Sequence, residues 1–131
     1  MIHLYIKLEG DLRHTILYEK GNNLEGKDNL SDLPAEPAVY AICGRVNGQP
    51  ANPRFVGEAD NLQEAVKNHF STAEAVTEDL KCVNDFIHSI KTKVLVYQIA
   101  TGITEDARRR IKERFIEMYE PRCNEEMNTV Y

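Results

Sequence analysis

The stretch KVLVYQIA, residues 93–100, most restricts how this chain can fold. Its apolar residues occupy both alternating faces, a pattern typical of a well-buried β-strand. Alternating apolar and polar residues predict further strands over 2–8, 13–19, 38–46 and 54–57. The last two are joined by a connection that carries an Asn-Gly turn signal. The chain is therefore expected to build a sheet.

Three helices are predicted beside these strands. Asp60 or Asn61 can cap the first helix. Its apolar stripe consists of Leu62, Ala65, Val66, His69 and Phe70. The second helix is predicted around 73–90, with a stripe of Val76, Leu80, Val83, Ile87 and Ile90. Thr104 is the predicted cap of the third helix, which ends before Pro121 because a residue preceding proline disfavours the helical conformation.

The order of elements from residue 38 onward is β-β-α-α-β-α, which predicts an α+β fold with helices packed on a small sheet. The two earlier strands can form a hairpin through EGDL, residues 9–12, and either extend the sheet or recruit a partner chain at its edge. With 131 residues, the chain is expected to be one domain. Its parts are a hairpin and loop (1–33), a core (34–124) and a tail (125–131).

Composition excludes several classes of protein. The chain is 42% hydrophobic and 28% charged, as ordinary globular proteins are. No apolar run approaches the roughly 18 residues that cross a membrane, and no signal-peptide pattern opens the chain, so we expect a cytoplasmic protein. Cys43, Cys82 and Cys123 are odd in number and scattered, so we expect reduced thiols with neither disulfide nor zinc site. The net charge of −5 disfavours broad phosphate binding but allows a local basic patch.

Four ordered segments resemble the GIY-YIG nuclease domain. They are AVYAI (38–42), RFVG (54–57), the NL…NH of the helix that follows, and FIEMYEPRCN (115–124). The resemblance covers about residues 34–124 and implies a three-stranded antiparallel sheet flanked by helices. It also implies metal-assisted phosphodiester hydrolysis. In that family two tyrosines lie near the attacking water, an arginine holds the phosphate, a glutamate holds a divalent cation, and an asparagine after a proline links the site.

Matched residue by residue, three of the five family positions lack the group that the chemistry requires. These positions are held, in chain order, by Tyr40, Phe55, Ala65, Lys112 and Asn124. Phe55 has no hydroxyl, and the ammonium group of Lys112 has no lone pair for a cation. Glu113 cannot replace the missing glutamate, since it projects away from the predicted buried side of the helix. That side comprises Ala107, Ile111, Phe115, Ile116, Met118 and Tyr119. The resemblance thus implies a degenerate site without metal or cofactor.

The retained residues also have plain structural roles. Tyr40 is expected to be a packed strand tyrosine, His69 a half-buried helix residue, and Asn124 the closing residue of the turn after Pro121. The run RRRIKER (108–114) is the candidate nucleic-acid patch. Its basic residues are Arg108, Arg109, Arg110, Lys112 and Arg114. They can instead form a solvated face, in which Glu105 pairs with Arg109 and Asp106 with Arg110 at i, i+4.

Three hypotheses follow. The first is a GIY-YIG-like domain that has lost endonuclease activity and serves as a binding module, with nucleic acid as a candidate partner. The second is an active endonuclease with a rearranged site, using Tyr40, His69 and Lys112 with Mg²⁺; it requires these residues to converge. The third is a homodimer formed through the strand edge within residues 2–19, with no nucleic-acid role.

Overall fold

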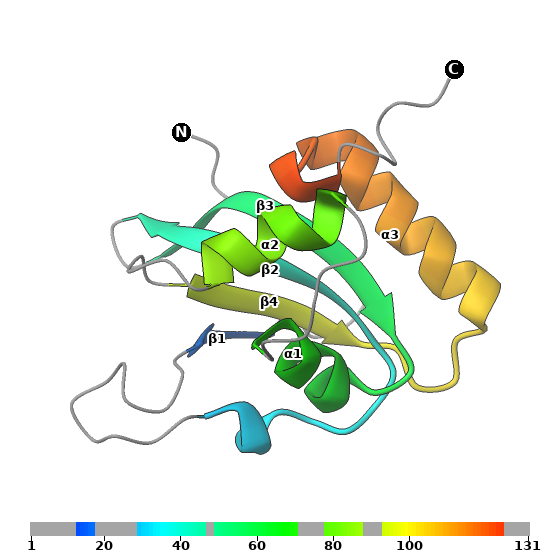
Figure 1. Ribbon diagram of the computed structural model, residues 1–131. Helices are drawn as coiled ribbons and strands as arrows, with labels where there is room; N and C mark the ends of the chain where they lie inside the picture. The colour runs from blue at the N-terminus through cyan, green and yellow to red at the C-terminus, as the bar shows by residue number, and fades with distance from the viewer. Residues whose placement is uncertain (1–12, 18–28, 47–48, 71–77, 88–92, 125–131) are drawn as a thin grey trace.

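A sheet of four antiparallel strands organises the computed structural model, which describes residues 13–17, 29–46, 49–70, 78–87 and 93–124. The strands are β1 (Arg13–Leu17), β2 (Ala38–Val46), β3 (Gln49–Ala59) and β4 (Lys93–Ile99). They lie in the order β1-β4-β2-β3 (Figure 1). The predicted three-stranded core is confirmed as β4-β2-β3, and β1 extends it by pairing with β4. The strand predicted over 2–8 lies outside the described residues.

Strand β3 is longer than its sequence predicts. The pairing of Val46 with Gln49 leaves only residues 47–48, outside the described residues, to connect it to β2. Residues 49–53, predicted as a connection, therefore belong to the strand. Pro50 and Pro53 argue against a strand interior because proline lacks an N–H group. They fit here because β3 lies at the edge of the sheet, where a strand needs partners on one side only.

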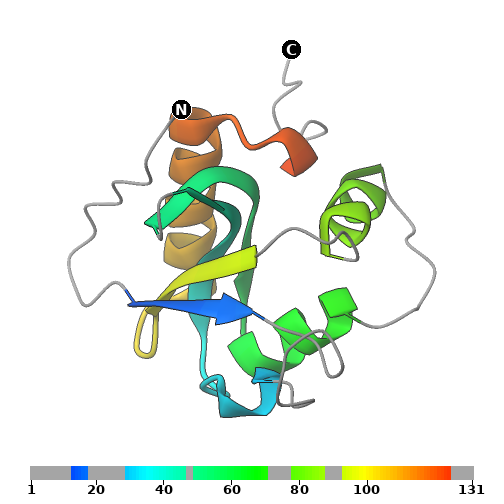
Figure 2. The same cartoon turned by 90° about the vertical axis from the view of Figure 1, so that its left-hand side faces the viewer.

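Helices cover both faces of the sheet. Helices α1 (Leu62–Phe70) and α2 (Glu78–Ile87) pack on one face, and α3 (Glu105–Tyr119) packs on the other (Figure 2). Alternate residues of β2 and β4 accordingly enter two separate apolar clusters. The α1–α2 core contains Tyr40, Ile42, Leu62, Val66, Phe70, Val83, Ile87, Leu95 and Tyr97. The α3 core contains Val39, Ala41, Cys43, Val56, Val94, Val96, Phe115 and Ile116. The prediction that β4 is buried on both faces is confirmed.

The first helix begins where the sequence predicts. The side-chain oxygen of Asn61 accepts a hydrogen bond from the Glu64 N–H at 3.0 Å, which makes Asn61 the cap. The preceding segment includes the short 3₁₀ helix η1 (Leu30–Asp32). This segment also holds the start of α1, because the side-chain amide of Gln63 donates to the main-chain oxygens of Ser31 and Leu33. Part of the loop predicted within residues 1–33 thus holds α1 in place.

Helix α3 has the predicted ends but a different buried side. Thr104 Oγ1 accepts from the Ala107 N–H at 3.1 Å, and the helix ends at Tyr119, two residues before Pro121. The predicted apolar side is confirmed for Phe115 and Ile116 and wrong for Met118, which is 58% exposed. Near its start the helix also buries a positively charged side chain.

That cation is Arg108, which is 4% exposed and ties α3 to the end of β3. Its Nε donates to the Glu58 carboxylate at 2.8 Å, and a terminal nitrogen donates to Asp60 at 2.5 Å. The hydrogen bond to Asp60, followed by that to Glu58, raises the pKa of the guanidinium above its usual value. Two carboxylates thus offset the cost of burying one positive charge.

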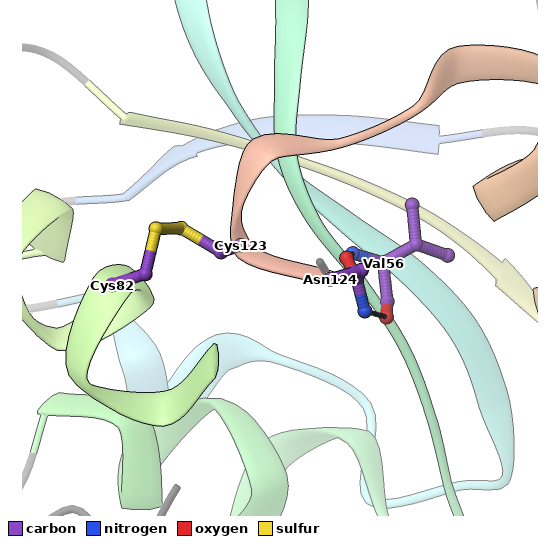
Figure 3. The surroundings of a disulfide bond; sticks show 4 residues. All are labelled: Val56, Cys82, Cys123 and Asn124. Carbon is purple, nitrogen blue, oxygen red and sulfur yellow. Dashed lines mark hydrogen bonds between the residues drawn. A yellow bond between two sulfur atoms is a disulfide. The ribbon is translucent and has the colours of Figure 1, made fainter. Parts of the chain in front are cut away.

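A disulfide between Cys82 of α2 and Cys123 contradicts the prediction of three reduced thiols (Figure 3). Cys123 belongs to the 3₁₀ helix η2 (Arg122–Asn124), and the two Cα atoms are 5.2 Å apart. The pair lies 41 residues apart in the chain, so spacing alone gave no sign of it. Cys43 is free and buried, as expected.

None of the helices in the described ranges has the length and apolarity that a membrane crossing requires.

We predict that Arg108→Ala lowers the free energy of unfolding by about 2 kcal/mol, because it leaves the partly buried Glu58 carboxylate without its cation. Arg109→Ala is the matched control on the same helix. Its partners are exposed, so it should change stability by less than about 0.5 kcal/mol. Urea denaturation of the three proteins measures both values, and equal losses in the two variants would contradict the structural role of Arg108.

Candidate functional site

Three rings from three elements meet where the resemblance places the catalytic centre. Tyr40 lies on β2, Phe55 on β3 and His69 on α1. The Tyr40 hydroxyl and His69 Nε2 form a hydrogen bond of 2.8 Å. The Phe55 ring stands edge-on to the His69 ring, with centroids 5.2 Å apart, and its centroid is 6.2 Å from that of Tyr40. The structure therefore brings these three residues together as a ring cluster.

Gly57 makes room for this ring cluster. It pairs with Tyr40 across β2 and β3, and a Cβ atom here would lie 2.7 Å from the Tyr40 hydroxyl and 2.9 Å from the Phe55 ring. No real side chain tolerates such distances without displacement. Gly57 does not end β3, as the sequence suggested, since the strand continues to Ala59. Its role is to let the Tyr40 ring lie across the strand.

Burial keeps both polar members of the ring cluster neutral. It raises the pKa of the Tyr40 hydroxyl well above its usual range, and the nearby Glu58 carboxylate raises it further. It lowers the pKa of His69 to about 4. With the His69 proton on Nδ1, the Tyr40 O–H donates to Nε2. Tyr40 is 5% exposed, which agrees with a packed strand tyrosine.

Asn124 clamps the free edge of β3. Its Oδ1 accepts from the Val56 N–H at 2.8 Å, and its Nδ2 donates to the Val56 carbonyl at 3.0 Å (Figure 3). The side-chain amide thus takes the place of a neighbouring strand. The Asn124 main-chain N–H also donates to Pro121 O at 3.1 Å, so the predicted turn closure is confirmed. The clamp itself was not foreseen, because nothing in the local sequence connects Asn124 to Val56.

Ala65 and Lys112, at the other two family positions, contribute no group to the ring cluster. Ala65 is partly buried against the α1–α2 core and carries no group that could hold a phosphate. Lys112 is half-buried on α3, whose apolar side packs on the opposite face of the sheet from Tyr40 and His69. Among the contacts of the described residues, none joins Lys112 to Tyr40 or His69. Glu113 is exposed, as the helix geometry predicts.

The basic run on α3 divides into buried and exposed members. Arg108 is buried against Glu58 and Asp60, which disfavours its predicted role as a nucleic-acid contact. Arg109 lies 3.5 Å from Glu105 and, unexpectedly, 3.7 Å from Asp106.

Arg110 does not form the predicted ion pair with the Asp106 carboxylate. Its Nε donates instead to the main-chain oxygen of Asp106 at 3.4 Å. Arg109, Arg110 and Arg114 are the exposed members of the run.

The residues at this site do not fit a catalytic cation. Within residues 13–17, 29–46, 49–70, 78–87 and 93–124, no three His, Cys, Asp or Glu side chains are grouped so as to hold a metal ion. The position of the family's glutamate holds Lys112, whose ammonium form cannot ligate a metal.

We predict that His69 makes the protein less stable in acid. Its pKa is about 4 when folded against an ordinary 6.5, so the unfolded chain binds a proton more readily. The stabilisation from neutral His69 is complete above pH 6.5 and disappears as the pH falls towards 4. It amounts to roughly 3–4 kcal/mol at about 1.4 kcal/mol per pKa unit.

Denaturation between pH 7 and 5 measures this effect. His69→Gln is the control, since its side chain can still accept the Tyr40 hydrogen bond and does not titrate. An unchanged pH slope in His69→Gln would contradict the assignment.

Comparisons with known proteins support the fold. No protein-family model matches the chain, and no curated protein matches it. Among solved structures, the GIY-YIG N-terminal endonuclease domain of UvrC from Thermotoga maritima, bound to magnesium, matches with a TM-score of 0.50 and 19% identity. The match covers 73% of this chain and 91% of that domain.

An asparagine-to-alanine point mutant of the same domain gives a TM-score of 0.49 at 18% identity, over 72% of this chain and 89% of the other. At such identity the likeness concerns fold alone. With its antiparallel sheet covered by helices on both faces, the chain has a GIY-YIG-like fold.

Proposed function

We propose that this GIY-YIG-like domain no longer hydrolyses phosphodiester bonds and serves as a binding module, with the exposed basic part of α3 contacting nucleic acid. The observation that carries the proposal is the partly buried hydrogen bond between Tyr40 and His69. A hydroxyl that helps to activate water has to reach the water and the phosphate. The Tyr40 hydroxyl is instead directed to His69, in a side chain that is 5% exposed.

The protonation states support the same conclusion. A general base works best when its pKa lies near the working pH. The pKa of the Tyr40 hydroxyl is raised by burial and by Glu58, which opposes the loss of its proton. The pKa of His69 is about 4, so this residue is neutral at pH 7 and its Nε2 already accepts the Tyr40 proton. The Tyr40–His69 pair is therefore suited to a structural role in the core and not to proton transfer.

The residues at three of the family positions also oppose phosphodiester hydrolysis. Removing a single group that stabilises a transition-state charge costs about 3–4 kcal/mol, or 10²- to 10³-fold in rate. Here Phe55, Ala65 and Lys112 stand at three such positions. Effects of residues that act together are not additive, so the total is smaller than the sum. Even one such loss makes hydrolysis slow.

Exposed arginines on α3 offer the contact surface. Arg109 pairs with Glu105 and Asp106 in solvent, and pairs of this kind contribute only about 0–1 kcal/mol. A phosphate can therefore replace the carboxylates. Arg110 and Arg114 are exposed on the same helix. Glu113 and Glu117 are exposed there as well, so we expect weak binding that depends strongly on salt.

We predict that the wild-type protein does not cleave single- or double-stranded DNA or RNA above background with Mg²⁺ or Mn²⁺. Gel assays with labelled substrates measure this, with Tyr40→Phe as the matched control. Metal-dependent cleavage that is lost in Tyr40→Phe would contradict the proposal and favour the hypothesis of an active nuclease.

We further predict that oligonucleotide affinity falls with salt and that the triple variant Arg109→Ala, Arg110→Ala, Arg114→Ala reduces the slope of log K against log[salt]. Each lost phosphate contact reduces it by about 0.9 on duplex DNA, so the largest reduction is about 3. Lys67→Ala, an exposed cation on α1, is the control and should leave the slope unchanged. A flat wild-type titration would refute the nucleic-acid contact. A dimer in sedimentation would then favour the homodimer alternative.

A further inference from the structure

The disulfide and the clamp on β3 are formed by neighbouring residues whose side chains point in different directions. Cys123 and Asn124 are consecutive residues of the three-residue helix η2. The Cys123 side chain reaches towards α2, where it is bonded to Cys82, and the Asn124 side chain reaches the other way to Val56 (Figure 3). Because η2 is so short, the position of Cys123 restricts that of Asn124. One covalent bond therefore helps to hold two hydrogen bonds in place.

The far end of the clamp lies next to the ring cluster. Val56 stands between Phe55 and Gly57 in β3. Phe55 is part of the ring cluster, and Gly57 gives the Tyr40 ring its space. A shift of β3 at Val56 therefore alters both sides of the ring cluster. The path from the disulfide to Tyr40 runs through η2 and one residue of the edge strand.

Helix α2 has its own attachments to the core. Val83 and Ile87 are each 1% exposed within the α1–α2 core. The Arg54 guanidinium of β3 also lies 5.2 Å from the centre of the Phe86 ring. These contacts do not depend on the disulfide. Breaking the bond should therefore leave α2 in place.

We propose that the Cys82–Cys123 disulfide is a redox switch for the Asn124 clamp. In the oxidised form the bond to α2 holds η2 in place, and Asn124 keeps the Val56 N–H and carbonyl covered. In the reduced form only the non-covalent contacts of η2 remain, so the clamp opens more often. The edge of β3 at Val56 then becomes accessible to solvent.

The reaction is a thiol–disulfide exchange with a dithiol reductant of the thioredoxin class. A thiolate of the reductant attacks Cys82 Sγ, in the half-buried partner of the pair, since Cys123 is 1% exposed. The bond between the two cysteine sulfurs breaks, and Cys123 leaves as a thiolate that takes up a proton. The second thiolate of the reductant attacks the mixed disulfide and releases Cys82, which is protonated. The reductant ends as a disulfide, having supplied two electrons.

The third cysteine does not take part. Cys43 lies in the α3 core on the opposite face of the sheet and is fully buried. Its burial raises the pKa of the thiol to about 12, so almost no thiolate is present at neutral pH. Cys43→Ala is therefore a control that lacks a thiol but keeps the switch.

Amide hydrogen exchange, followed by NMR in the oxidised protein and in the protein reduced with dithiothreitol, tests the proposal. Mass spectrometry without reductant first checks that Cys82 and Cys123 are joined. We expect reduction to speed exchange of the Val56 N–H by roughly tenfold or more, as for loss of one hydrogen bond. Amides at the centre of β4, such as those of Leu95 and Val96, should change by less than about twofold.

The variants separate the switch from a general loss of stability. Cys82→Ser should show the fast Val56 exchange in both conditions, and Cys43→Ala should behave as the wild type. Asn124→Ala should be fast in both conditions, because it removes the clamp and leaves the disulfide. Three results would overturn the proposal. They are the absence of the disulfide in oxidised protein, equal Val56 exchange in the two states, and a parallel loss of protection in β4, which would make the disulfide a general staple.

Discussion

The pair of hydrogen bonds between Asn124 and Val56 connects the C-terminal turn to the edge strand of the sheet. The Val56 N–H and carbonyl would otherwise be buried without partners, which costs about 1–3 kcal/mol for each group. One asparagine satisfies both, because an amide carries a donor and an acceptor side by side. The chain leaves α3 through Glu120 and Pro121 and reaches this contact directly after Cys123. The same contact holds the edge strand β3 at Val56. Its role is structural, since it holds the edge strand and the C-terminal turn together.

The ring cluster follows from the same edge strand. β3 is flanked by one strand only, and Gly57 lets Tyr40 lie across it. With the Phe55 ring beside it, the Tyr40 hydroxyl has His69 as its hydrogen-bond partner. A second hydroxyl here would draw water into the site, whereas the phenyl ring excludes it. The packing of Phe55 against His69 and the burial of the Tyr40 side chain therefore belong to one arrangement.

Local patterns in the sequence predicted the elements that depend on local physics. The alternation in β2 and β4, the Asn61 cap and the Thr104 cap each involve residues within one element or one turn. Two of the errors concern contacts between distant residues. Cys82 and Cys123 are 41 residues apart, and Arg108 pairs with Glu58 and Asp60 from another element.

Strand β3 was predicted too short for a related reason. Whether Pro50 is tolerated depends on which side of the sheet has a neighbour, and its own segment does not contain that information.

The basic run on α3 shows how such a distant contact changes a functional inference. From sequence, Arg108 and Arg109 are equivalent members of one patch. In the structure, Arg108 is held by Glu58 and Asp60 and fastens the helix to β3, while Arg109, Arg110 and Arg114 face solvent. The buried cation gives the helix its position, and that position decides which arginines can meet a phosphate. The nucleic-acid contact proposed for this face therefore depends on how the fold positions α3.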